Sequence, residues 1–535
     1  MSDSAKKQTF LHGAALLALA TAVVKIIGAF YKIPLKMIIG DQGYGYFITA
    51  YDVYNVLLLI STAGLPVAMS RMISQASSLG NSNQVRRIYK TARAIFLALG
   101  VVSSLFMVLG SQWLANEVLM QPKAAPAIAC LGPCALFMGI ISTFRGFFQG
   151  HGNMRPTSSS QVLEAFIKLA VGLCLAFVVM RQYNSVPFAA AGAILGVTCS
   201  CLVSAVYLFG KFRPAYRELG RGEDRPLSFG ATAKSLLAIA VPITIGSAGL
   251  QFLTVVEQKL YMGQLLTACG LSQDTADTMK GIYSMTMTIY NMPCAFIVPI
   301  AISVIPAITS HLTLMNNRGV RETEESAARI AGLISLPCSI GLCLLARPIM
   351  ALLGGYTGEK LELATRLMSV LGVCVFLYAI IQYTNALMQA HGYAYVPVVN
   401  MLLAGITKLG VVYVLVGNPN IGILGAPIGS VLAYAAIGAM NLIAISRIVP
   451  QKPALLKNLL RPLLPALMMG AAVFAAYWGM TRLLGPDGSR LLLCGVPIGV
   501  GVAVYCFGVV KCKSVTREDC QLLPKGDKIA KLLKL

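Results

Sequence analysis

FFQGHGNMRP (residues 147–156) and LMQAHGYAYVP (residues 387–397) are two versions of one segment within this chain. The residues that they share, and a lysine on the helix predicted after each segment, lie a constant 240 positions apart: Gln149, His151, Gly152 and Lys168 recur as Gln389, His391, Gly392 and Lys408. Self-similarity at a long fixed period indicates an internal structural repeat. The sequence therefore divides into two related halves.

The composition points to a lipid bilayer as the solvent of the chain. Of its 535 residues, 57% are hydrophobic and 12% are charged, and the mean hydropathy is +0.73, which is far from the values of soluble globular proteins. A barrel strand alternates apolar and polar residues, whereas residues 97–109 and 330–345 are apolar on every face. The fold class is therefore all-α and integral to the membrane.

Apolar runs of spanning length predict about fourteen transmembrane helices. They are residues 11–31, 44–66, 92–114, 126–148, 159–181, 187–210, 235–263, 281–308, 328–350, 362–388, 397–416, 422–446, 459–483 and 490–511. Each half contains six spans and begins on the same side of the membrane. The repeats are therefore parallel, related by an axis along the membrane normal, and two helices remain.

The predicted organisation follows from these spans. It consists of an N-lobe, a cytoplasmic inter-lobe loop, a C-lobe, two further helices and a basic cytoplasmic tail: residues 1–210, 211–234, 235–447, 448–511 and 512–535. Tyr54-Asn55 in the second span has an echo in Tyr290-Asn291 of the eighth, which supports the same division.

The formal net charge of +23 predicts the orientation of the chain. Lys and Arg concentrate in the connections on one side of the predicted spans, which is the bias of cytoplasmic loops. Nucleic-acid binding would need a soluble basic domain, and the sequence contains none. We expect a multi-pass protein of the bacterial cytoplasmic membrane, monomeric, with both termini inside and membrane lipids around it.

Sequence motifs for catalysis are absent. The fourteen cysteines are scattered singly through apolar segments, without a CxxC pair or a histidine at zinc-ligand spacing, so we interpret them as packing residues. The sequence has no phosphate-binding GxxxxGK[ST] loop and no GxSxG elbow. We expect no enzyme activity, no metal and no cofactor, and transport that draws on an ion gradient or the membrane potential.

Polar and ionisable residues within the spans are the candidates for a substrate-binding central cavity, because charge at bilayer depth is costly. They are Lys25, Lys32, Asp52, Asn55, Glu164, Lys168, Glu257, Lys259, Asn291 and Lys408. Glu164 and Lys168 are spaced for a same-helix pair. Lys408 has Ala404 at the matching position, so it needs an acid from another helix, cavity water or an anionic ligand. Lys32 and Lys259 have a second interpretation as side chains that reach an interface.

Proline and glycine concentrate in the second, seventh and eighth spans. The candidate hinge or gating residues are Gly64, Pro66, Pro242, Gly246, Pro293, Pro299 and Pro306. Proline removes a backbone hydrogen bond and bends a helix, so these spans are either moving parts or statically kinked. His151 and His391 occupy the same turn in both halves, which favours capping or packing over a substrate site.

Two segments carry a family resemblance: KIIGAFYKIPLKMIIGDQGYGYFITAYDVYNVLLLISTAGLPVAMSRMISQA (residues 25–76) and FRGFFQGHGNMRPTSSSQVLEAFIK (residues 144–168). They resemble the stage V sporulation protein B-like branch of the polysaccharide transporter family, in the MOP exporter superfamily with the MurJ, Wzx and MATE proteins. The resemblance implies a V-shaped pair of six-helix lobes, alternating access and an undecaprenyl-diphosphate-linked glycan or peptidoglycan precursor as substrate, in wall or spore-cortex biogenesis. Of three cavity arginines of MurJ-like proteins, one position holds Lys32, and the others fall at Leu58 and near Thr288.

Three functions stay open. A lipid-linked glycan flippase agrees with the two additional helices and the lysine-rich candidate set. A cation-coupled multidrug exporter of the MATE type would have twelve helices and an acidic cavity. A non-transporting membrane scaffold is the third interpretation.

Overall fold

A computed structural model describes residues 10–515 except 63, 221, 451–452 and 486–487. Throughout this part of the chain the regular elements are helices. The chain separates into two compact units, residues 1–281 and 282–535. The boundary falls within helix α9 and not in the connection 211–234 between the predicted lobes.

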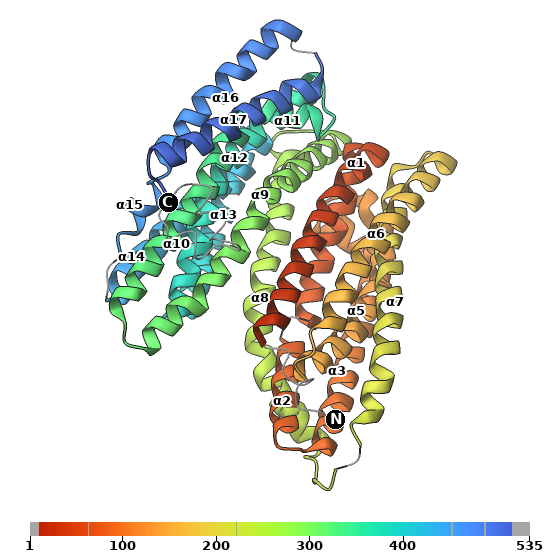
Figure 1. The fold of residues 1–535 in the computed structure, drawn as a ribbon. Coiled ribbons are helices and arrows are strands. Elements are labelled where there is room, and N and C mark those ends of the chain that lie inside the picture. The colour runs from red at the N-terminus through yellow and green to blue at the C-terminus, as the bar shows by residue number, and fades with distance from the viewer. Residues whose placement is uncertain (1–9, 63, 221, 451–452, 486–487, 516–535) are drawn as a thin grey trace. The chain divides into compact units, whose positions relative to one another are not determined.

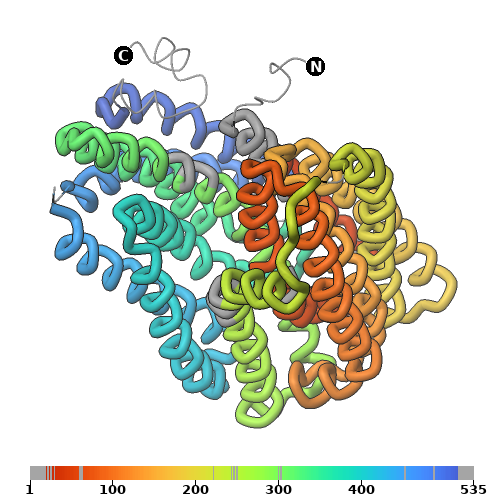
Figure 2. The backbone as a smooth tube through the Cα atoms, turned by 90° about the horizontal axis from the view of Figure 1, so that it is seen from below, coloured from red at the N-terminus to blue at the C-terminus, as the bar shows by residue number. Residues whose placement is uncertain are grey.

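The first unit is coloured red to yellow-green in Figure 1. Its elements are α1 (Phe10–Thr62), α2 (Leu65–Ser78), α3 (Ser82–Leu109), α4 (Ser111–Trp113), the π-helical turn η2 (Leu114–Val118), the 3-10 turn η3 (Pro122–Ala124), α5 (Ala125–Gly150), α6 (Arg155–Tyr183), α7 (Val186–Glu218), α8 (Phe229–Thr267) and the start of α9 (Gln273–Thr313). Seen from below in Figure 2, the orange and yellow helices of this unit pack side by side.

The second unit is built from the rest of α9 and the helices that follow it. They are α10 (Asn317–Leu344), α11 (Ala346–Leu352), α12 (Gly358–Ala390), α13 (Tyr395–Val416), the 3-10 turn η4 (Gly422–Leu424), α14 (Gly425–Ile448), α15 (Leu455–Leu459), α16 (Leu463–Leu484) and α17 (Arg490–Lys511). Its core contains Ile308, Val320, Leu387 and Met388, all fully buried.

The helices confirm the predicted membrane architecture. Within the described residues, ten helices are long and apolar enough to span a bilayer. The first, second, seventh and eighth predicted spans lie on α1, α8 and α9, which have 53, 39 and 41 residues. The sequence places a connection between its first two spans, and the structure breaks the helix there, because Gly40 has a non-helical backbone with a φ of 70° that divides α1 into two helices. Helix α7 extends to Glu218 and α8 begins at Phe229, so both helices reach into the predicted connection 211–234.

The repeat found in the sequence is present in the backbone. After α5, Gly152 has a φ of 71° and its N–H donates to the Gln149 carbonyl at 3.0 Å; after α12, Gly392 has a φ of 86° and donates to Gln389 at 3.1 Å. A left-handed residue that ends a helix in this way favours glycine. Packing also repeats, since α3 contacts α5 and α5 contacts α7 in the first unit, while α10 contacts α12 and α12 contacts α14 in the second.

A second pair of matching turns extends the repeat. The N–H of Asn81, before α3, donates to the Ala76 carbonyl at 2.9 Å, and the N–H of Asn316, before α10, donates to the His311 carbonyl at 2.9 Å. These residues are 235 positions apart. Helices α3 and α10 are therefore equivalent elements of the two halves.

Candidate functional site

Five charged side chains of the first unit interact, and we call them the charged cluster: Lys32, Asp52, Lys168, Glu257 and Lys280. Lys32 interacts electrostatically with Lys168 and Asp52, and Glu257 with Asp52 and Lys280. The cluster combines three lysines with two carboxylates, so one positive charge is in excess. A site of this kind attracts anions, provided that the like charges are held together by their surroundings.

An ion pair between α1 and α9 forms the buried side of the charged cluster. Lys280 Nζ lies 3.6 Å from Asp52 Oδ2, and the two side chains are 5% and 16% exposed. Lys280 also donates to Gln258 Oε1 at 3.0 Å, and Gln258 in turn donates to Thr49 Oγ1 at 3.0 Å. These hydrogen bonds satisfy an ammonium group that would be costly to bury alone.

Lys168 forms the more accessible side of the charged cluster. Its Nζ lies 5.9 Å from the ring centroid of Tyr31 and 6.0 Å from that of Tyr51, both on α1. Aromatic faces attract a cation at this distance. The Tyr31 hydroxyl donates to the Ala193 carbonyl at 3.3 Å, which fixes the first ring against α7. Lys168 is therefore positioned by aromatic rings, and its side chain is only partly buried.

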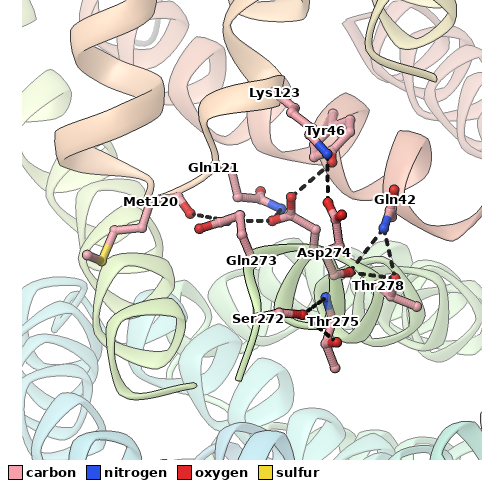
Figure 3. A network of polar contacts seen from close by, with 11 residues as sticks. Gln42, Tyr46, Met120, Gln121, Lys123, Ser272, Gln273, Asp274, Thr275 and Thr278 are labelled. Atoms are coloured by element: carbon pink, nitrogen blue, oxygen red, sulfur yellow. Dashed lines mark hydrogen bonds and ion pairs between the residues drawn. The ribbon is translucent and has the colours of Figure 1, made fainter. Parts of the chain in front are cut away.

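A polar network fastens the start of α9 to α1 and to the segment before α5 (Figure 3). The Asp277 carboxylate accepts hydrogen bonds from Tyr46 at 2.9 Å, Gln121 at 2.9 Å and Gln273 at 3.0 Å. Gln121 also accepts a hydrogen bond from Thr49, which links this network to the charged cluster. Because Asp277 is fully buried and satisfied three times, we assign it a structural role.

Glu164 does not form the predicted pair with Lys168. Its carboxylate lies 3.1 Å from Arg145 on α5, and the same arginine donates to Ser160 at 3.1 Å. The prediction was wrong because it considered spacing along one helix and overlooked the guanidinium of the neighbouring helix, which offers stronger hydrogen bonds to a carboxylate than an ammonium does.

The other candidates lie outside the charged cluster. Lys259 and Asn291 are exposed, and Asn55 and Lys408 are half-buried. Lys408, in the second unit, interacts electrostatically with Cys374 of α12. Lys25 lies on α1, but its side chain is outside the described residues.

The candidate hinge residues fall at different places in the helices. Gly64 and Pro66 mark the beginning of α2 and not a bend inside a span. A Cβ at Gly64 would lie 2.0 Å from the Ala240 carbonyl oxygen, so this position serves close packing of α2 on α8. Pro293 and Pro306 lie within α9. Pro242, Gly246 and Pro299 are among the helix positions whose surroundings lie outside the described residues.

His151 and His391 take different roles in matching turns. His151 Nδ1 is 2.9 Å from the Phe147 carbonyl of its own helix, whereas His391 Nε2 is 2.7 Å from Glu324 Oε1 on α10. Both contacts agree with the expected packing or capping role. No group of three metal-binding side chains occurs in the described chain.

Sequence reasoning missed Lys280 and Arg145. The eighth span was predicted to begin at residue 281, but α9 begins at Gln273, which brings Asp277 and Lys280 inside the helix. The helical spacing of Asp274, Asp277 and Gly281 along one face was the available signal that the helix begins before residue 281. Arg145 lies inside the predicted fourth span and belonged among the candidate residues, because a charge at bilayer depth is costly.

Comparisons with known proteins cover most of the chain. The sequence profile described as "polysaccharide biosynthesis protein" matches residues 10–311. The chain is 27% identical over 550 residues to the uncharacterized membrane protein YabM of Bacillus subtilis, covering 100% of this chain and 99% of that protein. It is 25% identical over 450 residues to stage V sporulation protein B of the same organism, covering 83% and 85%.

Solved structures show the same fold. A lipid II flippase MurJ in an inward closed conformation superposes with a TM-score of 0.69 at 13% identity, covering 93% of this chain and 98% of that one. An inward-facing multidrug resistance MATE family transporter of the MOP superfamily gives a TM-score of 0.64 at 17% identity, covering 81% and 99%. The fold of the chain is therefore that of the MOP superfamily.

Proposed function

Because this chain belongs to the polysaccharide biosynthesis protein family, we propose that it moves a lipid-linked glycan across the membrane. The substrate we propose is an undecaprenyl-diphosphate-linked glycan or a peptidoglycan precursor similar to lipid II, carried by alternating access. The description of the family and a Bacillus subtilis relative named lipid II flippase MurJ, 23% identical over 519 residues, support this substrate class.

The observation that carries the proposal is the position of Lys168. It lies between two tyrosine rings and within electrostatic range of Lys32, in a cluster with more lysines than acids. A diphosphate between a glycan and a polyprenyl tail is the charged part of such a substrate, and lysines bind phosphate as compact point charges. The two lysines repel each other until an anion lies between them, so phosphate binding stabilises the cluster.

We propose a monomeric transporter of the cytoplasmic membrane, with both termini inside and without catalytic activity or a cofactor. The energy for transport then comes from an ion gradient or from the membrane potential. A charge that crosses part of the membrane gains energy from that potential.

The test is transport in vesicles. The purified chain is reconstituted with a fluorescent undecaprenyl-diphosphate glycan, and transport is followed by the fraction that a membrane-impermeant quencher reaches. Lys168→Ala should lower the initial rate about tenfold or more, because a lost charge-assisted contact costs about 1.5–3 kcal/mol. Lys408→Ala tests the equivalent lysine of the second half, and we expect a similar loss.

Lys259→Ala is the matched control, because it removes an exposed lysine from the helix that carries Glu257. It should transport at the wild-type rate. Full activity of the Lys168→Ala/Lys408→Ala double variant would refute the assignment of the site. Rescue of a strain depleted of its lipid II flippase would identify a peptidoglycan precursor as substrate.

Drug export is the second candidate function, favoured by the fold similarity to a MATE transporter. The two functions differ in what they transport, so the same vesicles distinguish them. Uptake of a cationic dye driven by an imposed proton or sodium gradient, without movement of the glycan lipid, would favour export. A chain that moves neither compound would favour the scaffold interpretation.

A further inference from the structure

One end of the first unit carries basic side chains around a group of aromatic rings. Tyr89 of α3 stacks on Phe212 of α7 with centroids 4.6 Å apart, and it lies 5.2 Å from Tyr216. Phe147 of α5 closes the group at 5.0 Å from Phe212. These rings join three helices at the end where α7 finishes at Glu218.

Arginines lie against these rings. Arg86 is 5.2 Å from the Tyr216 centroid and Arg93 is 5.8 Å from that of Tyr89, within the range of cation–π attraction. Arg213 lies 5.9 Å from the exposed ring of Phe209. Aromatic contact restricts the arginine side chains and leaves guanidinium donors available.

Acidic residues do little to neutralise this end. Residues 82–93 and 209–218 contain seven basic side chains and one acid, Glu218: Arg86, Arg87, Lys90, Arg93, Lys211, Arg213 and Arg217. The following residues 219–228 add two acids, Glu223 and Asp224, but also two bases, Arg221 and Arg225, so they leave this excess unchanged. The positive charge of this end is therefore largely uncompensated.

The equivalent helix of the second half is different. At the 235-residue spacing, the positions of Arg87 and Lys90 are held by Glu322 and Glu325. Glu325 pairs with Arg321 at 3.0 Å, and Glu322 pairs with Arg318 at 2.7 Å. The charge bias of cytoplasmic loops predicts similar basic residues at the starts of α3 and α10, because both helices begin on the same side of the membrane. The excess positive charge in the first half therefore indicates a negatively charged partner that binds this half.

An apolar strip leads away from the basic residues. Leu202, Val206 and Phe209 lie on one face of α7, are 45%, 63% and 49% exposed, and are followed on that face by Arg213. On a membrane-spanning helix such a strip contacts acyl chains. A ligand that places a phosphate at Arg213 and an apolar tail along this strip is a lipid, because a soluble anion has no apolar tail.

We propose that this basic–aromatic surface of α3 and α7 binds the headgroup of an anionic phospholipid. The partner is a phosphodiester lipid with net negative charge, such as phosphatidylglycerol or cardiolipin, of the leaflet that this end faces. The assignment requires only that the chain spans a membrane, so it stands independently of the transported substrate. Basic clusters beside transmembrane helices attract anionic lipids in this way.

The test counts lipids bound to the purified full chain. Native mass spectrometry with phosphatidylglycerol or phosphatidylcholine added should show preferential adducts of the anionic lipid. The triple variant Arg93→Gln/Arg213→Gln/Arg217→Gln should bind phosphatidylglycerol about a hundredfold more weakly, because each basic residue contributes a factor of about five at an anionic surface. The corresponding triple Lys variant should retain most of the binding, since it keeps the charge.

The matched control is Arg318→Gln/Arg321→Gln/Arg447→Gln, which removes three charges from the second half and should bind the lipid as wild type does. A thermal melt in phosphatidylcholine establishes that each variant is folded. Equal binding of the two lipids by the wild-type chain, or unchanged binding by the Gln variant, overturns the proposal. Displacement of the lipid by millimolar inorganic phosphate or glycerol 3-phosphate also overturns it, because the site would then hold a soluble anion.

Discussion

Equivalent residues of the two halves differ in their surroundings at the matching turns of His151 and His391. His391 contacts the fully buried Glu324, whereas His151 contacts the backbone carbonyl and the ring of Phe147. On α3 the position equivalent to Glu324 is Tyr89, which belongs to the aromatic group. The same backbone position therefore holds a carboxylate in one half and a ring in the other.

This difference predicts unequal effects of one substitution. His391→Ala removes the partner of a buried carboxylate, so it should lower the free energy of unfolding by roughly 3 kcal/mol. His151→Ala should cost about 1 kcal/mol, the usual value of a single hydrogen bond. Thermal denaturation of both variants in the same detergent measures the difference, and equal losses would contradict the assigned roles.

At the scale of elements, the close packing of α9 against α1 stabilises the first unit. A Cβ on Gly281 would lie 1.8 Å from the Asp41 carbonyl oxygen, immediately after the interruption of α1 at Gly40. The Asp277 network and the Asp52–Lys280 pair lie on these same two helices. Gly281 and these polar groups therefore stabilise the same contact between α1 and α9.

Gly281→Ala should therefore separate α9 from α1 and destabilise the chain by about 2 kcal/mol or more, as overpacking does. Gly410→Ala, in α13, is the control, because nothing lies within 4 Å of its added Cβ and alanine favours a helix. Melting temperatures compare the two variants. A Gly281→Ala protein as stable as wild type would show that the helices are not in contact.

The elements were largely predictable from sequence, and the side-chain partners were not. Spanning length and apolar runs locate helices such as α6 and α17 because the bilayer imposes those lengths. The Glu164–Arg145 pair joins two helices that no periodicity relates. Lys280 was missed because hydropathy places the start of a span where polarity falls, while the α9 backbone continues beyond the apolar run.

For the whole molecule, the distribution of charge predicts an orientation. Segment 219–228 follows the basic end of α7, whereas 268–272 contains no basic residue. An epitope inserted at 268–272 should react with antibody on intact spheroplasts, and one at 219–228 only after permeabilisation. The reverse pattern would place both termini outside.

The matching turns at Gly152 and Gly392 also have an evolutionary meaning. Six crossings return a polypeptide to the side from which it started, so two copies of a gene can be joined head to tail without inverting either product. An ancestor of half the present length had only to pair with itself. Once joined, two such copies can diverge, as they have at the equivalent positions of Tyr89 and Glu324.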